Sequence, residues 1–450
     1  MFTVMRVCDR HRLIQRQMQG MAVGLALSCA ALAPFATADV IGDWDAIGQS
    51  TINAPNLPAL GGFPAVTPEE MRPNTQADLA TLHVAMYDAV IAIAGGFKPY
   101  AIKPVVPTAG ASQEAAAGGA ACGVLQALFP NRAPKYAAAC APYLATSPGG
   151  PAVLKGIAVG IEVAHGIVAL RANDGRLNTL VYVPDGTPGN FIPSSPALVG
   201  LNAQFIRPFA VKSVAQFRAP PPPALNSERY EQDFNLTKEL GSATSTTRTP
   251  EQSEIARFHT DTPGLGRNLR RFSNDTRSIA ANARLMAMIF VAQADVASTC
   301  FESKYHYARW RPRTAIPAAD TDGNDETIAD PTWLPFLPTP NHPEYPAAHS
   351  CVYSALAGSL RGFFHTSHVH FDLDSNAFLA IDGTVHVHHF DSLKQLLAEA
   401  RLARIAGGMH FSTSTLRGIQ LGTRVSHYVN AHYFRPVKHE DDDDDGDDRD

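Results

Sequence analysis

Two basic residues seven positions apart begin the part of the sequence that could do chemistry. Lys304 and Arg311 stand in CFESKYHYARWRPRTAI. A spacing of seven is about two turns of helix, so both cations project from one face. Pro312 disfavours helical geometry at Arg311, which puts that guanidinium near the helix end. With no acidic partner on that face, the pair predicts an anion bound between the cations; a solvated basic face is the structural alternative.

A helix start follows in PNHPEYPAAHSCVYSALAG. We expect Pro346 at the first helical position, so that the amides of Ala347 and Ala348 lack intrahelical partners. Such amides form an anion site, and the small Ala side chains let an oxyanion approach closely. His349 stands beside them and could move a proton near neutral pH, although a histidine in this place more often caps or hydrogen-bonds.

The third segment is EARLARIAGGMHFSTSTLRG. Arg404 is expected to end one helix, Gly407-Gly408 to break it, and His410 to precede the next helix near Ser412. On a continuous helix Arg404 and His410 would point about 120° apart, so the break is what could let them converge. The three segments together predict one positively lined pocket with an imidazole at its base.

These motifs, Lys304-x6-Arg311-Pro312, Pro346-Ala347-Ala348-His349 and Arg404-x5-His410, resemble the three-part signature of the vanadium-dependent haloperoxidase and type 2 phosphatidic-acid phosphatase (PAP2) superfamily. The soluble bacterial haloperoxidase-like branch is the most similar. HVAMYDAV (83–90), ALRANDGR (169–176) and FRAPPPPAL (217–225) extend the likeness over most of the chain. The resemblance implies a mainly α fold of helical bundles with at most a short β-hairpin.

The resemblance also implies a role for each residue. Lys304, Arg311 and Arg404, with the backbone at Ala347 and Ala348, would bind the non-axial oxygens of vanadate. His410 would be the axial metal ligand and His349 the acid–base group. The small-molecule substrates would be hydrogen peroxide, polarised by Lys304, a halide that is oxidised to hypohalous acid, and an organic acceptor.

Two other functions stay open. The same cage could bind phosphate and hydrolyse phosphomonoesters, with His410 as nucleophile forming a phosphohistidine and His349 protonating the leaving group. It could also bind an oxyanion without catalysis. Two positions depart from the usual pattern: Ala347 replaces a common serine and removes a hydroxyl donor, and Ser414 replaces a common acidic residue. The second change predicts an unpaired His410 imidazole, which is a poorer nucleophile.

Helical periodicity supports the implied fold class. Apolar residues recur at helical spacing near 77–95, 113–128, 151–172, 228–240, 276–309, 347–364, 391–406 and 414–430. The best strand signals are 369–374 and 384–390, with Asp382-Gly383 as turn residues. Thr249, Pro250 and Gln252 form a helix-start signature. We place a soft boundary near residue 245, between an N-terminal helical half (39–245) and a helical catalytic domain (246–438).

Composition and charge narrow the class of protein. The 450 residues are 45% hydrophobic, which excludes a wholly disordered chain. The net charge of -5 arises at the ends, because residues 1–38 carry +3 and the tail 439–450 carries -8. The body is neutral, so nothing predicts nucleic-acid binding. Oligomeric state is not readable from the sequence.

The two ends of the sequence have the composition of a cleavable signal peptide and of a solvated tail. Residues 1–38 combine arginines, a short apolar stretch and Ala36-Thr37-Ala38, which predicts a signal peptide and a periplasmic or secreted protein. Later apolar stretches contain Glu162, His165 or Asp295, so we expect buried helices and no stable membrane insertion. The run of Asp in 439–450 predicts a disordered acidic tail.

The pairing of the cysteines and the role of a group of histidines stay open in the sequence. Removal of the signal would leave Cys122, Cys140, Cys300 and Cys351, which allow three pairings; buried thiols or a local Cys122–Cys140 bridge are favoured. A second group consists of His365, His368, His370, His386, His388 and His389. It suggests a divalent-metal site, but an exposed polar hairpin is favoured, because no Cys or carboxylate completes a recognisable ligand set.

Overall fold

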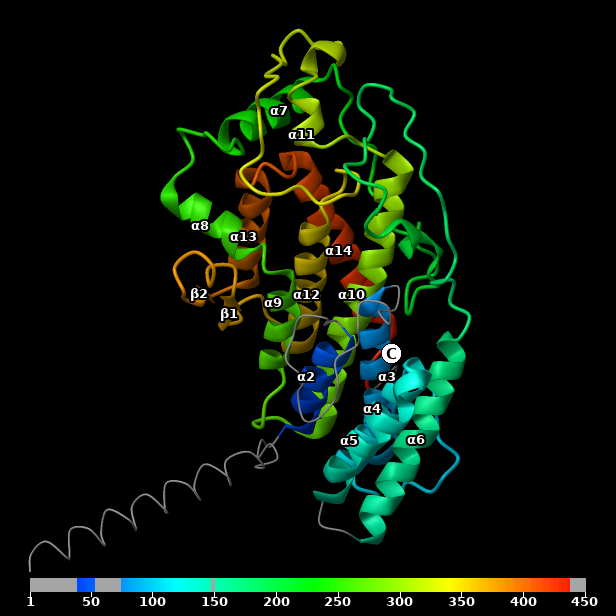
Figure 1. Ribbon diagram of the computed structural model, residues 1–450. Coiled ribbons are helices and arrows are strands. Elements are labelled where there is room, and N and C mark those ends of the chain that lie inside the picture. Colours follow the sequence, from blue (N-terminus) through cyan, green and yellow to red (C-terminus); the bar gives the residue numbers. More distant parts are fainter. Residues whose placement is uncertain (1–38, 53–73, 147–149, 438–450) are drawn as a thin grey trace, which may run out of the picture. The chain divides into compact units, whose positions relative to one another are not determined.

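The computed structural model describes residues 39–52, 74–146 and 150–437 (Figure 1). The predicted signal peptide (1–38) and acidic tail (439–450) lie outside the described residues, so both stay predictions.

Helices dominate the described part, which confirms the predicted fold class. The helices are α2 (Val40–Ile52), α3 (Thr75–Ala94), α4 (Gln113–Leu128), α5 (Ala133–Thr146), α6 (Pro151–Arg171), α7 (Glu228–Leu240), α8 (Pro250–Phe258), α9 (Thr262–Leu269), α10 (Ile279–Tyr307), α11 (Pro312–Ala315), α12 (Ala348–Phe364), α13 (Leu393–Ala406) and α14 (Ser412–His432). Short 3₁₀ turns lie at Pro130–Arg132, Leu201–Phe205, Arg270–Phe272 and Ala319–Thr321.

Side-chain caps explain where several of these helices begin. Thr249 and Gln252 form a capping box at the start of α8, with Pro250 in its first turn, as the sequence predicted. Ser278 caps the long helix α10 by accepting from the amide of Ala281, and Ser392 caps α13 in the same way. These caps fix the starts of the two helices that carry Lys304 and Arg404 in their last turns.

Helices from both sides of residue 245 share the main hydrophobic core. The central helix α10 packs against α3 on one side and α12 on another, and α12 packs along α14 (Figure 1). Leu82 of α3, Met286 of α10 and Leu356 of α12 are each completely buried in this core. The core therefore holds together the helices whose ends carry the candidate site.

Two buried carboxylates position long loops over this core. Asp88 accepts hydrogen bonds from the amides of residues 100–102, and Asp295 accepts from the amides of residues 209–211. Each carboxylate satisfies three backbone donors that would otherwise be buried without a partner. Burial raises the pKa of Asp88 and of Asp295 to about 6. The HVAMYDAV segment thus has a structural role through Asp88.

The predicted hairpin is present as a two-stranded antiparallel sheet. Strands β1 (Phe371–Ser375) and β2 (His386–Phe390) pair with Phe371 opposite Phe390. Both strands are shorter than expected, and residues 376–385 connect them. Gly383 has a positive φ of 78°, consistent with the expected turn chemistry at Asp382-Gly383.

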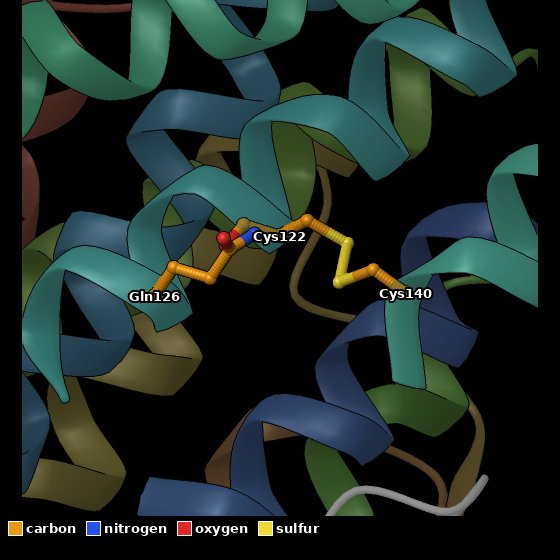
Figure 2. Close-up of a disulfide and its surroundings, with 3 residues drawn as sticks. All are labelled: Cys122, Gln126 and Cys140. Carbon is orange, nitrogen blue, oxygen red and sulfur yellow. A yellow bond between two sulfur atoms is a disulfide. The ribbon is translucent and has the colours of Figure 1, made fainter. Parts of the chain in front are cut away.

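One disulfide joins α4 to α5 within the described residues. Cys122 and Cys140 are bonded, with an S–S distance of 2.00 Å (Figure 2). The predicted local bridge is therefore confirmed. Cys300 and Cys351 are buried free thiols in the structure.

Among the described residues, the helices α3, α6 and α10 are long and apolar enough to cross a membrane, judged by length and composition alone. The apolar windows of α3 and α10 are 83% and 89% buried inside the protein, whereas that of α6 is 39% buried. The expectation of buried helices is therefore confirmed for α10, which carries Asp295, but not for α6, which carries Glu162 and His165 and is less than half buried. The absence of membrane insertion stays a prediction.

Candidate active site

The signature residues lie at the ends of four helices that converge. Lys304 is in the last turn of α10, and Arg311 directly precedes α11. His349 is in the first turn of α12, Arg404 is in the last turn of α13, and His410 lies between α13 and α14. All are buried except His349, which is partly exposed.

Arg311 and His410 are in direct contact. The Nη1 of Arg311 lies 3.0 Å from Nε2 of His410 and donates to the carbonyl of Met409 at 2.9 Å. A guanidinium can only donate, so Nε2 of His410 must be the accepting nitrogen and Nδ1 must carry the proton. The ring therefore presents the lone pair of Nε2 to the cations.

The glycine break brings His410 back to Arg404, as the sequence predicted. Gly408 has a φ of 71°, and a Cβ at this position would lie 2.3 Å from the carbonyl oxygen of Gly241. Only glycine fits this approach. The chain then folds back so that the amides of Met409 and His410 both donate to the carbonyl of Arg404, at 3.1 and 3.3 Å.

The start of α12 differs from the prediction in two details. The helix begins at Ala348, with Ala347 as its cap, so Pro346 lies before the cap and not at the first helical position. The amide of Ala347 is not available to an anion, because it donates to the carbonyl of Ser414 at 3.1 Å. The amides of Ala348 and His349 donate to no group among the described residues. These two amides keep the predicted capacity to bind an oxyanion.

Glu344 supplies the carboxylate that the sequence seemed to lack near His410. Its Oε1 lies 3.0 Å from Nδ1 of His410 and accepts from the amide of Phe411 at 3.0 Å. The expectation that the change to Ser414 leaves the imidazole unpaired is therefore wrong. Ser414 instead supports Glu344, because its Oγ donates to the Glu344 carbonyl at 3.2 Å.

Lys304 and Arg311 are both held by the segment 342–344. Lys304 Nζ donates to the carbonyls of Pro343 and Glu344, at 2.8 and 3.0 Å. Arg311 Nε donates to the carbonyl of His342, and its Nη2 lies 2.9 Å from Nδ1 of the same histidine. Sequence reasoning missed His342 and Glu344. Their one available signal was their place in PNHPEYPAAH, a few residues before His349.

Every cation in this cluster has a lowered pKa. Burial is the largest cause, and it lowers the pKa of Lys304 to about 7, of Arg311 to about 10 and of Arg404 to about 9. The charge of Arg311 lowers the pKa of Lys304 and of Arg404 further. The charge of Arg311 thus acts on both of the other cations.

The same cations also lower the pKa of both imidazoles, His349 and His410. Burial lowers the pKa of His349 well below its usual value, followed by the charges of Arg404, His259 and Lys304. Burial and the charge of Arg311 likewise lower the pKa of His410. Burial also raises the pKa of Glu344, the carboxylate that contacts His410, to about 7. This carboxylate is therefore only weakly acidic.

Arg404 has the least satisfied side chain of the cluster. Its Nη2 lies 2.8 Å from the sulfur of Met409, a weak acceptor, and its buried Nε has no hydrogen-bond partner among the described residues. A buried guanidinium without an oxygen acceptor is costly unless an anion completes it. The cluster therefore has the donors and the excess positive charge that a tetrahedral oxyanion would neutralise.

A cavity of about 220 Å³ reaches Arg311 from outside. Its apolar wall comes from residues 191–193 and Pro340, and its polar wall includes Arg313 and Asn341. A cavity of this size admits peroxide, a halide or a small organic molecule to the neighbourhood of Arg311.

The histidine-rich hairpin is bound to carboxylates and is not simply an exposed polar surface. His386 and His388 lie on one face of β2 and both contact Glu254, at 2.8 and 2.9 Å. His388 also contacts Glu399 at 2.7 Å. The other histidines of the group, at 365, 368, 370 and 389, are exposed as expected. No three His, Cys, Asp or Glu residues in the described ranges are arranged to hold a metal ion.

Comparison with known proteins agrees with the fold and the signature. Residues 284–439 match the family model of the VCPO second helical-bundle domain. A search of curated proteins finds no significant match. The family match covers the segment that carries Lys304, Arg311, His349, Arg404 and His410.

Three solved bacterial structures share the fold. A vanadium-dependent iodoperoxidase is 22% identical, with a TM-score of 0.69, and the match covers 89% of this chain and 96% of the other. The holo form of a vanadium-dependent chloroperoxidase is 15% identical, with a TM-score of 0.67 and coverage of 87% and 97%. The apo form of a vanadium-dependent chloroperoxidase is 16% identical, with a TM-score of 0.65 and coverage of 80% and 94%. Residues 284–439 therefore match the VCPO second helical-bundle domain, and the described chain shares the fold of these bacterial vanadium-dependent haloperoxidases.

Proposed function

We propose that this protein is a vanadate-dependent haloperoxidase that uses hydrogen peroxide to oxidise a halide to hypohalous acid. The observation that carries the proposal is a buried cluster in which Arg311 contacts Nε2 of His410 and the charges of Lys304 and Arg404 lower the pKa of the same imidazole. In this cluster Nε of Arg404 has no hydrogen-bond partner among the described residues. Such a cluster is stable as a binding site for an anion and costly without one.

The residues fit vanadate on chemical grounds. Guanidinium groups and the amides of Ala348 and His349 supply donors for oxygens, and the neutral His410 ring supplies a nitrogen lone pair for the metal. Glu344 accepts from the other ring nitrogen and so fixes the tautomer and the orientation of the ring. When bound, vanadate would act as a Lewis acid that activates hydrogen peroxide toward the halide.

The protonation state of His349 favours oxidation over ester hydrolysis. Burial and the neighbouring cations lower its pKa, so in the anion-free site the imidazole is neutral at neutral pH and can accept a proton, although as a weaker base than an exposed histidine. Haloperoxidase chemistry needs a base here to take a proton from hydrogen peroxide. Phosphomonoester hydrolysis needs an acid to protonate the leaving group, which a neutral imidazole cannot do. Lys304 and the two arginines remain the groups that hold the oxyanion and its substrate.

One observation keeps a phosphatase as the second candidate. The hydrogen bond between Glu344 and His410 provides the carboxylate–imidazole pair that a histidine nucleophile requires. Phosphate would then occupy the same cage, and a phosphohistidine would form at Nε2. A protein that binds an oxyanion without turnover is the third outcome of the test below.

The test is a halogenation assay on the purified chain with and without orthovanadate. Hydrogen peroxide with bromide or iodide should halogenate a phenolic dye only after vanadate is added. His410→Ala should abolish this activity, while His427→Ala, which changes an exposed histidine on the same helix α14, should retain it. Hydrolysis of p-nitrophenyl phosphate that vanadate inhibits would support the phosphatase instead. Phosphate binding with neither activity would support the non-catalytic protein.

A further inference from the structure

Cys300 of α10 and Cys351 of α12 are in contact next to the candidate active site, close in sequence to Lys304 and His349. Their sulfur atoms are 2.7 Å apart, closer than two packed thiols but farther apart than the roughly 2.05 Å of a disulfide. Both side chains are buried. Cys300 also lies 3.9 Å from the carbonyl of Pro346, at the approach to α12.

Each cysteine is a close neighbour of a site residue. Cys300 precedes Lys304 by four positions on α10, so the two side chains lie on the same face of the helix. Cys351 follows His349 by two positions on α12. A covalent bond between these sulfur atoms would therefore join α10, which carries Lys304 in its last turn, to α12, which carries His349 in its first turn.

The two sulfur atoms differ in reactivity. Burial raises the pKa of Cys300, but the hydrogen bond from the Cys351 thiol and the charge of Lys304 outweigh burial and lower it. Burial raises the pKa of Cys351, and the hydrogen bond to Cys300 raises it further. The thiolate is the reactive form of cysteine, so Cys300 is the attacking sulfur and Cys351 the resolving one.

We propose that Cys300 and Cys351 form a second, redox-active disulfide that links α10 to α12 behind the oxyanion cage, with hydrogen peroxide as the oxidant. The Cys300 thiolate attacks one peroxide oxygen, the O–O bond breaks, and the leaving hydroxide takes a proton to become water. The sulfur of Cys351 then displaces the hydroxyl of the Cys300 sulfenic acid as a second water. Two thiols are oxidised by two electrons in total, and one peroxide is reduced to two waters.

Burial explains why this pair would respond to peroxide in particular. The exposed fractions of Cys300 and Cys351 are 1% and 0%, which excludes bulky oxidants from both sulfur atoms. Hydrogen peroxide is small, and the cavity lined by Arg311 admits small molecules to the cation cluster, although neither cysteine lines this cavity. The inference goes beyond the proposed function, because the bond requires neither vanadate nor halide.

The test is a peptide map of the full-length protein without vanadate. The protein is mildly reduced and treated with hydrogen peroxide, its remaining thiols are alkylated under denaturing conditions, and it is digested without reduction. We expect a linked peptide that contains Cys300 and Cys351, which reverts to two separate peptides on reduction. Alkylation of both cysteines after peroxide treatment would overturn the proposal. Because the readout is a mass, a failure of the haloperoxidase assay would not affect it.

Matched single variants test the order of attack. Cys351→Ser leaves Cys300 without its resolving partner, so its sulfenic acid should persist and react with dimedone, a 1,3-diketone that traps this species. Cys300→Ser should be tagged at Cys351 at least about tenfold less, because that thiol lacks the influence of Lys304. Equal tagging of the two variants would overturn the assignment of Cys300 as the attacking sulfur.

Discussion

Glu344 Oε1 and His410 Nδ1 lie 3.0 Å apart in a site from which solvent is excluded. Arg311 donates to the other nitrogen of the same ring, so the two contacts together set the tautomer. Glu344 reaches the ring from the loop before α12, and not from the start of α14 where the sequence pattern suggested an acidic residue. The orientation of the candidate metal ligand therefore depends on Glu344.

Replacement of this carboxylate should weaken binding of vanadate. In Glu344→Gln the side-chain amide can donate to Nδ1, which would move the ring proton to Nε2 and remove the lone pair from the site. We expect affinity for orthovanadate to fall about 10–100-fold, as for other residues that orient metal ligands. Calorimetric titration measures this, with Glu239→Gln, an exposed residue on α7, as control. Unchanged affinity in Glu344→Gln would contradict the role assigned to this residue.

Replacement of Arg404 should stabilise the oxyanion-free protein but remove its binding of orthovanadate. Because its buried Nε has no partner among the described residues, Arg404→Met should increase the free energy of unfolding by about 1–3 kcal/mol when no oxyanion is present. The same variant should lose binding of orthovanadate. Urea denaturation with and without vanadate checks both effects: vanadate at a hundred times its Kd should stabilise the wild type by about 2.7 kcal/mol and the variant not at all.

Arg361→Met, which changes an exposed arginine on α12, is the matched control for Arg404→Met. It should change neither the stability nor the response to vanadate. A loss of stability in Arg404→Met without any oxyanion would show that the arginine is a structural residue, and would contradict its assignment to the binding site.

Lys304 should give stability and anion binding opposite dependences on pH. Its folded pKa of about 7 lies below the ordinary value of 10.5, so between these pH values the unfolded chain holds a proton that the folded chain lacks. The contribution of Lys304 to stability therefore rises with pH in this window. Affinity for an oxyanion should fall in the same window as the ammonium loses its charge.

Sulfate is a suitable probe for this effect, because its charge does not change over the window. A bound anion stabilises the ammonium and should move the midpoint of the affinity loss above pH 7. Lys304→Met should remove most of the pH dependence, whereas Lys394→Met, at an exposed position on α13, should keep it. Equal pH profiles for the two variants would contradict the prediction.

The sequence predicted the residues of the site better than it predicted their partners. Lys304 and Arg311 could be paired from the sequence because their spacing reflects helix geometry, and Arg404 and His410 because Gly407-Gly408 breaks the helix between them. The contact of Glu344 with His410 joins residues 66 positions apart, and it depends on the path of the loop before α12. No local pattern encodes such a path.

Two other details could not be read from the sequence for related reasons. The helix α12 begins at Ala348 and not at Pro346. The amide of Ala347 donates to the carbonyl of Ser414 on another segment, a contact that no local pattern shows. The approach of Cys300 to Cys351 depends on how α10 packs against α12. Periodicity gives the buried face of a helix, but the register between two helices is set by the packing of all their side chains.

Glu399 should be a key residue for the stability of the hairpin. Its carboxylate contacts His259 at the end of α8 and His388 on β2, at 2.9 and 2.7 Å, and thereby ties both to α13. Glu399→Gln should lower the free energy of unfolding by about 2–4 kcal/mol, because it leaves the buried imidazole of His259 without a charged acceptor and removes one of the two carboxylates that contact His388. Glu251→Gln, an exposed change on α8, should have little effect.

The effect of Glu399→Gln should be largest in mildly acidic solution. Burial opposes ionisation of Glu399, but hydrogen bonds from His259 and His388 lower its pKa to about 2, so its contribution is full above the ordinary value of 4.5 and is lost as the pH falls toward 2. Burial opposes protonation of His388, but Glu399 and Glu254 raise its pKa above 6.5. The contribution of protonated His388 to stability is therefore full below pH 6.5 and is lost at higher pH. Urea denaturation of the wild type and the variant should therefore differ most between pH 4.5 and 6.5. A difference that is constant from pH 3 to pH 9 would show that packing, and not the ionic contacts, makes Glu399 important.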